Sequence, residues 1–257
     1  MVPRCLTIAT SDSGGGAGVQ ADLRAFAAAG CYGASVIVGL TAQNTVGIEA
    51  VHEVPAEFVE AQLRAVLGDI GADAVKTGAL LSADLVEVVA AGLSGRGLPL
   101  VVDPVVAATT GRRLSDAGAL AATVKLLFPL ATVVTPNLRE AELLAGGTGS
   151  RRELAERIAA RGAAAVLVTG GHGEPVDHLF AGGEHLEIPV PRHPVAATHG
   201  AGCTHSATLA AELAKGQPLR AAAERSAAVT AEAVRRGLTE IGAGEGPVDV
   251  TGLGEAR

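Results

Sequence analysis

The chain has 257 residues, of which 48% are hydrophobic, 18% are charged and only 2% are aromatic, with 34 glycines. This length and composition suit a large α/β domain with a core of Ala, Val and Leu, and they argue against extensive disorder. The formal net charge of -7 gives no basic surface for a nucleic acid, and with no Trp and one Tyr there are few side chains for base stacking.

Short apolar runs alternate with Ala-rich amphipathic stretches along the chain, which predicts βαβ units and a largely parallel sheet covered by helices. Strands are expected at 6–9, 35–40, 74–76, 100–102, 132–135 and 165–169, and a strand pair at 177–190. Helices are expected at 19–29, 56–69, 83–92, 115–127, 139–144, 151–161, 201–215 and 219–236. We interpret residues 1–257 as a single domain with a loosely held, Gly-rich tail at 242–257.

The N-terminus and the cysteines indicate a cytoplasmic protein. Residues 1–10 hold only a short apolar run, which is neither a secretion signal nor a membrane span. Cys5, Cys31 and Cys203 are odd in number and widely separated, so they support neither a disulfide framework nor a zinc site. We assign Cys5 and Cys31 to the core as small buried hydrophobes.

Polar sequences follow the predicted strands, at the edge of a parallel sheet where ligands bind. In order they are ATSDSGGGAG, TAQNT, KTG, DP, PNLRE and GGH. Turn chemistry alone also favours Gly, Pro, Asn and Asp at such positions. The convergence of six polar segments on one edge nevertheless favours a binding site.

The most specific of these segments is THGAGCTHS, Thr198–Ser206, which runs straight into an apolar helix. Unpaired amides and the positive end of the helix dipole make such an entrance a cradle for phosphate. The pattern is neither a Walker A loop nor the dinucleotide fingerprint, and an ordinary loop-to-helix entry remains the alternative. At this position the dipole is expected to lower the thiol pKa of Cys203, which favours a base; the alternative is a small buried hydrophobe.

Three oxygen-bearing side chains follow two other strands. Asp103 comes directly after the strand at 100–102, and Asn137 and Glu140 lie on one face of a helical first turn. Carboxylate and amide oxygens suit a hydrated Mg²⁺. The alternative is that Asn137 caps the helix and Glu140 completes a capping box.

Taken together, these motifs resemble the hydroxymethylpyrimidine and phosphomethylpyrimidine kinases of thiamin biosynthesis, within the ribokinase-like superfamily. The similarity runs from about Leu6 to Arg236. It comprises SDSGGGAGVQADLRAF, YGASVIVGLTAQNT, DAVKTG, DPVVAATTG, TPNLREAELL, VLVTGGHG and THGAGCTHSA. QADL together with TAQNT is more specific than GAGC, which the whole superfamily shares.

The resemblance implies a ribokinase-like three-layer α/β/α sandwich with a central, mostly parallel sheet. It implies ATP-dependent phosphorylation of a hydroxymethyl group on 4-amino-5-hydroxymethyl-2-methylpyrimidine, and then of the resulting monophosphate. A homodimer is also implied, with no nucleic-acid or membrane partner.

Site residues follow by matching positions to the family. Gly200, Ala201, Gly202 and Cys203 would form the anion hole, with Cys203 as the catalytic base. Asp22, Gln43, Gly18 and Val105 would bind the substrate. Asn137, Glu140, Thr169 and Gly171 would bind ATP, and Asp103 and Glu140 would support Mg²⁺ through water. Independently, the carboxamide of Gln43 can both donate and accept, which fits an aminopyrimidine edge.

The chain departs from the family pattern at several positions. Residues that differ from the usual ones are Ser13, Gly14, Ala79, Thr169, Ala201 and His205. Thr169 replaces a lysine and so removes a cation near the nucleotide phosphates. His205 replaces a leucine and is interpreted as incidental, and the alternative is a contact with phosphate. Ala201 replaces a threonine with little expected effect on phosphate binding, because an anion hole uses main-chain N–H groups.

Two alternatives remain at this point. The first is pyridoxal or pyridoxine kinase activity, alone or as a second activity, because that substrate is also a hydroxymethylated nitrogen heterocycle. The second is a non-catalytic small-molecule binding domain on the same scaffold. The joint presence of Asp103, Glu140 and Cys203 favours a catalyst, since a binding domain needs no base beside an anion hole.

Overall fold

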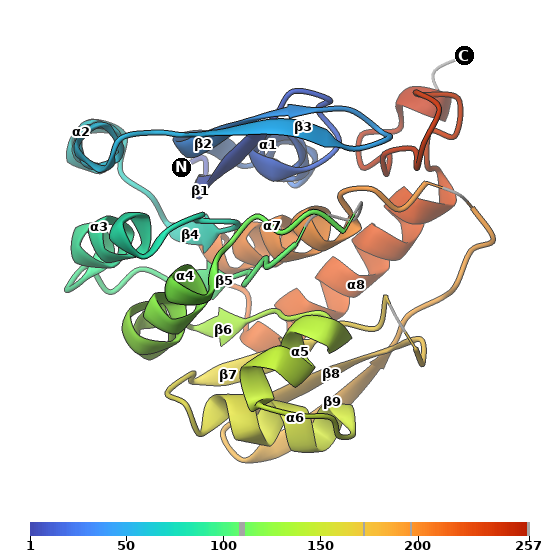
Figure 1. The fold of residues 1–257 in the computed structure, drawn as a ribbon. Helices are drawn as coiled ribbons and strands as arrows, with labels where there is room; N and C mark the ends of the chain where they lie inside the picture. The colour runs from blue at the N-terminus through green and yellow to red at the C-terminus, as the bar shows by residue number, and fades with distance from the viewer. Residues whose placement is uncertain (108–110, 172, 196, 256–257) are drawn as a thin grey trace.

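The computed structural model describes residues 1–107, 111–171, 173–195 and 197–255. Its strands are β1 (Arg4–Asp12), β2 (Tyr32–Gln43), β3 (Ile48–Glu53), β4 (Ala74–Thr77), β5 (Leu100–Val102), β6 (Val133–Val134), β7 (Ala165–Val168), β8 (Val176–Ala181) and β9 (Glu184–Pro189). They form one nine-stranded sheet in the order β3-β2-β1-β4-β5-β6-β7-β8-β9 (Figure 1). The strands from β2 to β7 in this order pair in parallel, whereas β3, β8 and β9 join antiparallel.

Helices cover both faces of the sheet. They are α1 (Gly18–Ala28), α2 (Ala56–Ala65), η1 (Val66–Ile70), α3 (Ala83–Leu93), α4 (Ala117–Ala122), η2 (Thr123–Leu127), η3 (Phe128–Leu130), α5 (Leu138–Ala145), α6 (Arg151–Ala159), α7 (Ala201–Ala214), α8 (Leu219–Arg235) and η4 (Leu253–Glu255). One apolar core lies between the sheet and helices α2 to α6, and a second lies between the sheet and α1, α7 and α8 (Figure 1). The buried strands β4, β5 and β7 are near-continuous apolar runs because helices pack on both of their faces.

The predicted α/β/α architecture is confirmed by this sheet between two helical layers. The sequence pattern did not indicate β3, because most of its residues are exposed and it pairs only along one edge. The helix expected at 115–127 is instead the short α4 followed by a π-helical turn, η2. Within the described ranges, no helix has the length and apolarity needed to cross a bilayer.

Part of the segment expected to be a loose tail is firmly attached. Val248 is 7% exposed and Asp249 only 2% exposed. The amide of Val248 donates to the carbonyl of His199 (3.1 Å), and the amide of His199 donates to the carbonyl of Gly246 (3.2 Å). This short backbone pairing supports the loop that enters α7. Residues 256 and 257 of the expected tail lie outside the described residues.

Candidate active site

The entrance of α7 lies at the carboxyl edge of the sheet, between two of the predicted site residues. Ser206, in the second turn of α7, donates its hydroxyl hydrogen to Asp103 Oδ2 at 2.9 Å. On the other side, His199 Nε2 lies 3.5 Å from Gln43 Nε2. The helix entrance is therefore joined to the end of β5 and to the end of β2.

A buried ion pair lies beneath this entrance. Lys76, on β4, places its Nζ 2.9 Å from both carboxylate oxygens of Asp22, on α1, and neither side chain is exposed. Thr7 donates its hydroxyl hydrogen to Asp22 Oδ2 at 2.5 Å. Burial acts to lower the pKa of Lys76, but the charges of Asp22, Cys203 and Asp103, together with the hydrogen bond to Asp22, outweigh it and raise that pKa. The Asp22 carboxylate is enclosed and bonded within the protein, and its contact with the substrate stays a prediction.

Cys203 shares this neighbourhood, and its acidity differs from the expectation. Burial raises the pKa of the Cys203 thiol to about 12. The charge of Lys76 and the main-chain amide of Gly18 act to lower that pKa, whereas the charges of Asp22 and Asp103 raise it. The pKa of this thiol is therefore raised and not lowered as predicted, because desolvation and the charges of two nearby carboxylates oppose its ionisation. The contact of Gly18 with the substrate stays a prediction.

The backbone at the start of α7 has the form of an anion cradle. Gly200 is the N-cap in a left-handed conformation (φ 81°), and a Cβ there would overlap the carbonyl oxygen of Gly16. The amide of Ala201 is already bonded to the carbonyl of Thr198 at 3.0 Å. Gly202 is exposed and Cys203 is half-buried. First-turn amides of a helix lack intrahelical acceptors, so Gly202 and Cys203 are the amides best suited to an anion.

Asp103 and Glu140 form a pair of buried carboxylates. Asp103 is 6% exposed and Glu140 is 7% exposed. Burial and the neighbouring charge of Asp103 raise the pKa of Glu140 to about 8. Burial also raises the pKa of Asp103, although Lys76 Nζ lies 3.9 Å from Asp103 Oδ2 and opposes that rise. Two carboxylates with too little nearby positive charge fit a divalent cation.

The capping interpretation of Asn137 and Glu140 is also confirmed. Asn137 Oδ1 accepts from the Glu140 amide, and Glu140 Oε2 accepts from the Asn137 amide, both at 3.0 Å. Glu140 Oε1 accepts from the amide of Val106 at 3.3 Å. Both carboxylate oxygens already have main-chain donors, so Glu140 suits a cation held through water better than direct coordination.

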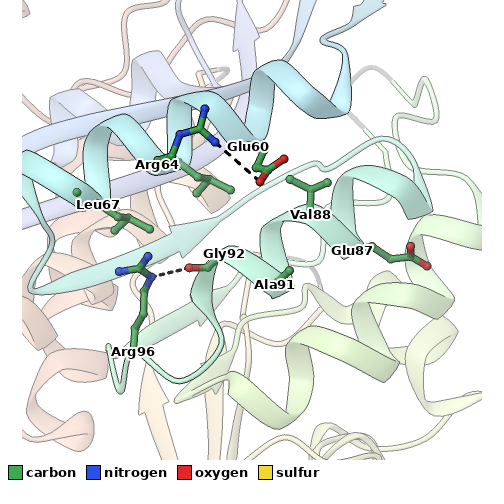
Figure 2. Close-up of a pocket in the computed structure, with 10 residues that line it drawn as sticks. Glu60, Arg64, Leu67, Glu87, Val88, Ala91, Gly92 and Arg96 are labelled. Atoms are coloured by element: carbon green, nitrogen blue, oxygen red, sulfur yellow. Dashed lines mark hydrogen bonds and ion pairs between the residues drawn. The ribbon is translucent and has the colours of Figure 1, made fainter.

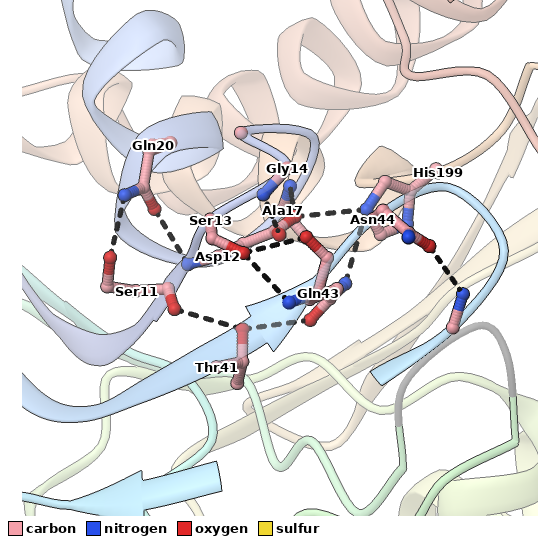
Figure 3. A network of polar contacts seen from close by, with 12 residues as sticks. Ser11, Asp12, Ser13, Gly14, Ala17, Gln20, Thr41, Gln43, Asn44 and His199 are labelled. Carbon is pink, nitrogen blue, oxygen red and sulfur yellow. Dashed lines mark hydrogen bonds and ion pairs between the residues drawn. The ribbon is translucent and has the colours of Figure 1, made fainter. Parts of the chain in front are cut away.

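Figure 3 shows a second polar network, at the end of β1 and β2. Asp12 accepts from the amides of Gly14 (2.8 Å) and Ala17 (2.9 Å), and its Oδ2 lies 3.1 Å from His199 Nε2. Burial acts to raise the pKa of Asp12, but the His199 ring and the two amides outweigh it and lower that pKa. A carboxylate only accepts, so His199 Nε2 carries the hydrogen.

That hydrogen fixes how the Gln43 amide must be oriented. Thr41 Oγ1 lies 3.1 Å from both Ser11 O and Gln43 Oε1, but its hydroxyl has only one hydrogen to donate. The single hydrogen on His199 Nε2 points to Asp12. The Gln43 amide is therefore best placed with its nitrogen facing Thr41 and its oxygen facing Nε2, where the oxygen can share that hydrogen across the longer contact of 3.5 Å. The remaining N–H and lone pair of Gln43 are then left for a ligand.

The other predicted residues also lie at this edge. Thr169 forms an isolated parallel bridge with Asn137, and its amide donates to the carbonyl of Pro136 at 3.0 Å. Gly171 follows in an exposed turn. Val105 is half-buried, with its amide bonded to Asp103 O (2.9 Å) and its carbonyl bonded to Ser115 Oγ (2.8 Å). Its main chain therefore has little capacity left for a substrate in this conformation.

A separate groove of about 630 Å³ lies between α2, η1 and α3 (Figure 2). Its lining residues are Glu60, Leu63, Arg64, Leu67, Gly68, Glu87, Val88, Ala91, Gly92 and Arg96. None of them is a predicted site residue, and two of the charged ones pair with each other across one helical turn. The groove is therefore distinct from the site at the carboxyl edge.

Sequence reasoning missed the roles of Lys76, Asp12 and His199. A usable signal existed for Lys76, because a lysine in a strand expected to be buried on both faces requires a buried counter-charge. Asp12 and His199 stand inside SDSGGG and THGAGC, but nothing in the sequence indicated that the two segments meet. Among the residues that the structure describes, no group of three or more His, Cys, Asp or Glu is arranged as a metal site.

Two relatives of known name match nearly all of this chain. A hydroxymethylpyrimidine/phosphomethylpyrimidine kinase of Rhizobium meliloti is 48% identical over 96% of this chain and 97% of its own length. A bifunctional thiamine biosynthesis protein of Geobacter sulfurreducens is 46% identical over 95% of this chain, which spans 51% of that protein. The alignment with the Rhizobium meliloti relative thus covers nearly all of both chains.

Solved structures agree on the fold. A Bacillus subtilis pyridoxal kinase in complex with ADP superposes with a TM-score of 0.89, at 33% identity, over 98% of this chain and 99% of that one. A phosphomethylpyrimidine kinase of Clostridium difficile gives 0.80 at 36% identity, over 90% and 99% of the two chains. The model of the phosphomethylpyrimidine kinase family matches residues 12–249. The chain therefore belongs to the phosphomethylpyrimidine kinase family.

Proposed function

We propose that this chain transfers the γ-phosphoryl group of ATP to the hydroxyl of 4-amino-5-hydroxymethyl-2-methylpyrimidine, and then phosphorylates the monophosphate to the diphosphate. Family membership and the names of the full-length relatives support this function. One structural observation carries it. The entrance of α7 lies between Asp103, bonded through Ser206, and Gln43, reached through His199, so that anion cradle, acidic pair and amide face one site.

Gln43 recognises the heterocycle in this proposal. With its oxygen held toward His199, its free N–H and lone pair can meet a ring nitrogen and the adjacent exocyclic amine. Burying such a polar pair discriminates strongly against ligands that lack the matching groups. The Asp12–His199 pair serves to keep that amide oriented.

Cys203 takes the proton of the attacking hydroxyl in the first step. Its thiol needs a nearby cation to ionise, and Lys76 supplies that charge from beneath. In the second step the nucleophile is an anionic phosphate, so proton removal matters less. The amides of Gly202 and Cys203 stabilise charge on the transferring phosphoryl group.

Asp103 and Glu140 would hold Mg²⁺, Glu140 through water, with Asn137, Thr169 and Gly171 along the ATP phosphates. The two buried carboxylates fit this role because burial raises the pKa of both, and a cation beside them would favour their charged forms. When bound, the cation neutralises phosphate charge and offsets the carboxylates that oppose thiol ionisation. With Thr169 in place of a lysine, main-chain amides at this edge carry more of the phosphate binding.

Pyridoxal is the second candidate acceptor, because the structure superposes more closely on pyridoxal kinase than on the phosphomethylpyrimidine kinase of Clostridium difficile. ATP turnover by the purified chain distinguishes the candidates. We expect ADP release with the aminopyrimidine alcohol and with its monophosphate, and the diphosphate as the final product by mass spectrometry. Turnover with pyridoxal alone would replace the proposal, and turnover with none of the three acceptors would refute it.

We further propose a cytoplasmic homodimer. Large apolar side chains are exposed on β2 and α2, namely Tyr32 (53%), Leu40 (45%) and Phe58 (60%), and they favour association with another copy. Light scattering at micromolar concentration tests this, and a mass of 25.5 kDa for the species in solution would contradict it.

A further inference from the structure

His205 is buried among groups that belong to three different elements. It lies in the first half of α7, is 5% exposed, and places Nε2 2.8 Å from Asp177 Oδ2 on β8. Asp177 is 2% exposed, and its other oxygen accepts from the amide of Gly170 at 2.6 Å. A continuous chain of contacts thus leads from α7 to the turn after β7.

The ring is held by this one strong contact. A carboxylate only accepts, so Nε2 carries the hydrogen and donates to Asp177. Ser226 Oγ lies 3.4 Å from the same nitrogen but donates its own hydrogen to Ala223 O at 2.9 Å. Among the described residues, His205 Nδ1 is buried without a hydrogen-bond partner. Burying an imidazole with one nitrogen unbonded costs free energy that an apolar side chain would avoid. This cost indicates that the hydrogen bond to Asp177 is what His205 contributes.

The backbone of Gly170 is fixed by tight packing as well as by the hydrogen bond of its amide to Asp177. A Cβ at Gly170 would lie 2.7 Å from backbone atoms of Val176, so the turn packs directly on the start of β8. The preceding residue, Thr169, pairs with Asn137 at the site edge. The position of the Gly170 amide therefore sets where the turn stands relative to the entrance of α7.

We propose that His205 is a positioning residue that, through Asp177, holds the turn at Thr169, Gly170 and Gly171 in register with the anion cradle of α7. The same helix that carries Gly202 and Cys203 thereby fixes the turn that binds the ATP phosphates. This inference rests on the proposed kinase function. It predicts that His205 affects the binding of ATP and does not affect the binding of the aminopyrimidine.

The experiment compares His205→Leu, His205→Gln and Thr208→Val. Thr208 is the matched control, because it lies on the same helix, is 2% exposed and has no hydrogen-bond partner among the described residues. Losing a buried hydrogen bond to a charged group should weaken binding of a non-hydrolysable ATP analogue about tenfold in His205→Leu. The KM of the aminopyrimidine should stay within about twofold, and Gln, whose amide can reach Asp177, should restore most of the ATP affinity.

Hydrogen exchange provides the second measurement, and it needs no catalysis. The Gly170 amide should exchange faster in His205→Leu than in the parent chain, while amides in the middle of α3, which does not pack on α7, stay unchanged. Unchanged ATP affinity in His205→Leu, or an equal loss of ATP and aminopyrimidine binding, would overturn the inference. A parent chain that binds no ATP analogue would instead contradict the proposed function.

Discussion

Replacing Lys76 with methionine should destabilise the protein strongly, because it leaves the Asp22 carboxylate buried without its counter-charge. Lys76 Nζ lies 2.9 Å from both oxygens of Asp22, and both side chains are fully enclosed. With an effective dielectric constant of about 20, the attraction at this separation is about 6 kcal/mol. Part of that is offset by desolvation, and removing one partner of such a pair typically costs about 3–5 kcal/mol.

Proton uptake limits this cost and makes it depend on pH. In the Lys76→Met variant, Asp22 can become neutral in the folded state, which at pH 7 costs about 4 kcal/mol for an ordinary carboxyl of pKa about 3.9. The folded variant then binds a proton that the unfolded chain does not. Its stability deficit should therefore shrink by about 1.4 kcal/mol for each pH unit below 7, until the pH approaches 4.

Equilibrium urea unfolding at pH 7 and at pH 5 measures both effects. At pH 7 the thermal midpoint should also fall by about 6–20 °C, given about 2–4 °C per kcal/mol for a domain of this size. The double variant Asp22→Leu/Lys76→Met is the control, and it should recover most of the stability, because the enclosed Asp22 charge is gone and only the longer contact of Lys76 with Asp103 (3.9 Å) is lost. A loss below about 1 kcal/mol in Lys76→Met, or a deficit that does not change with pH, would refute the reasoning.

Further predictions concern the site itself. Cys203→Ala should lower kcat for the aminopyrimidine alcohol by about 100-fold or more and affect the monophosphate less, and equal losses in separate assays would contradict this. Because the pKa of Cys203 is about 12, iodoacetamide should modify it about tenfold faster per pH unit between pH 7 and 10, without a plateau. Gly200→Ala should lower kcat by about 100-fold, since a Cβ would displace the cradle from Gly16, and an active variant would exclude that role. Gln43→Leu should raise the KM of the aminopyrimidine about tenfold or more at constant KM for ATP, and a parallel rise of both would point to misfolding.

The sequence predicted the parallel sheet because strands buried on both faces consist of short apolar runs. The amphipathic helices between them were recognised by the helical spacing of their apolar residues. It also placed the polar segments at one edge, because parallel strands all end on the same side. β3 escaped prediction because its residues are mostly exposed and its pairing is with one neighbour only. The turn of η2 was not foreseen because over a single turn the sequence pattern does not distinguish i→i+5 from i→i+4 hydrogen bonding.

What the sequence determined by itself is the set of groups available: a Gly-flanked helix entrance with a thiol, two carboxylates after successive strands, and an amide at the end of β2. The positions of these groups depend on local turn and capping preferences, which are determined by residues adjacent in the sequence. Only the tertiary structure decided how the groups are paired. The register of β1 on β4 sets Thr7 opposite Lys76 and turns both toward α1, which encloses Asp22. Likewise, the acidity of Cys203 and the anchoring of His205 depend on burial and on charges distant in sequence, because electrostatic energies follow separation in space.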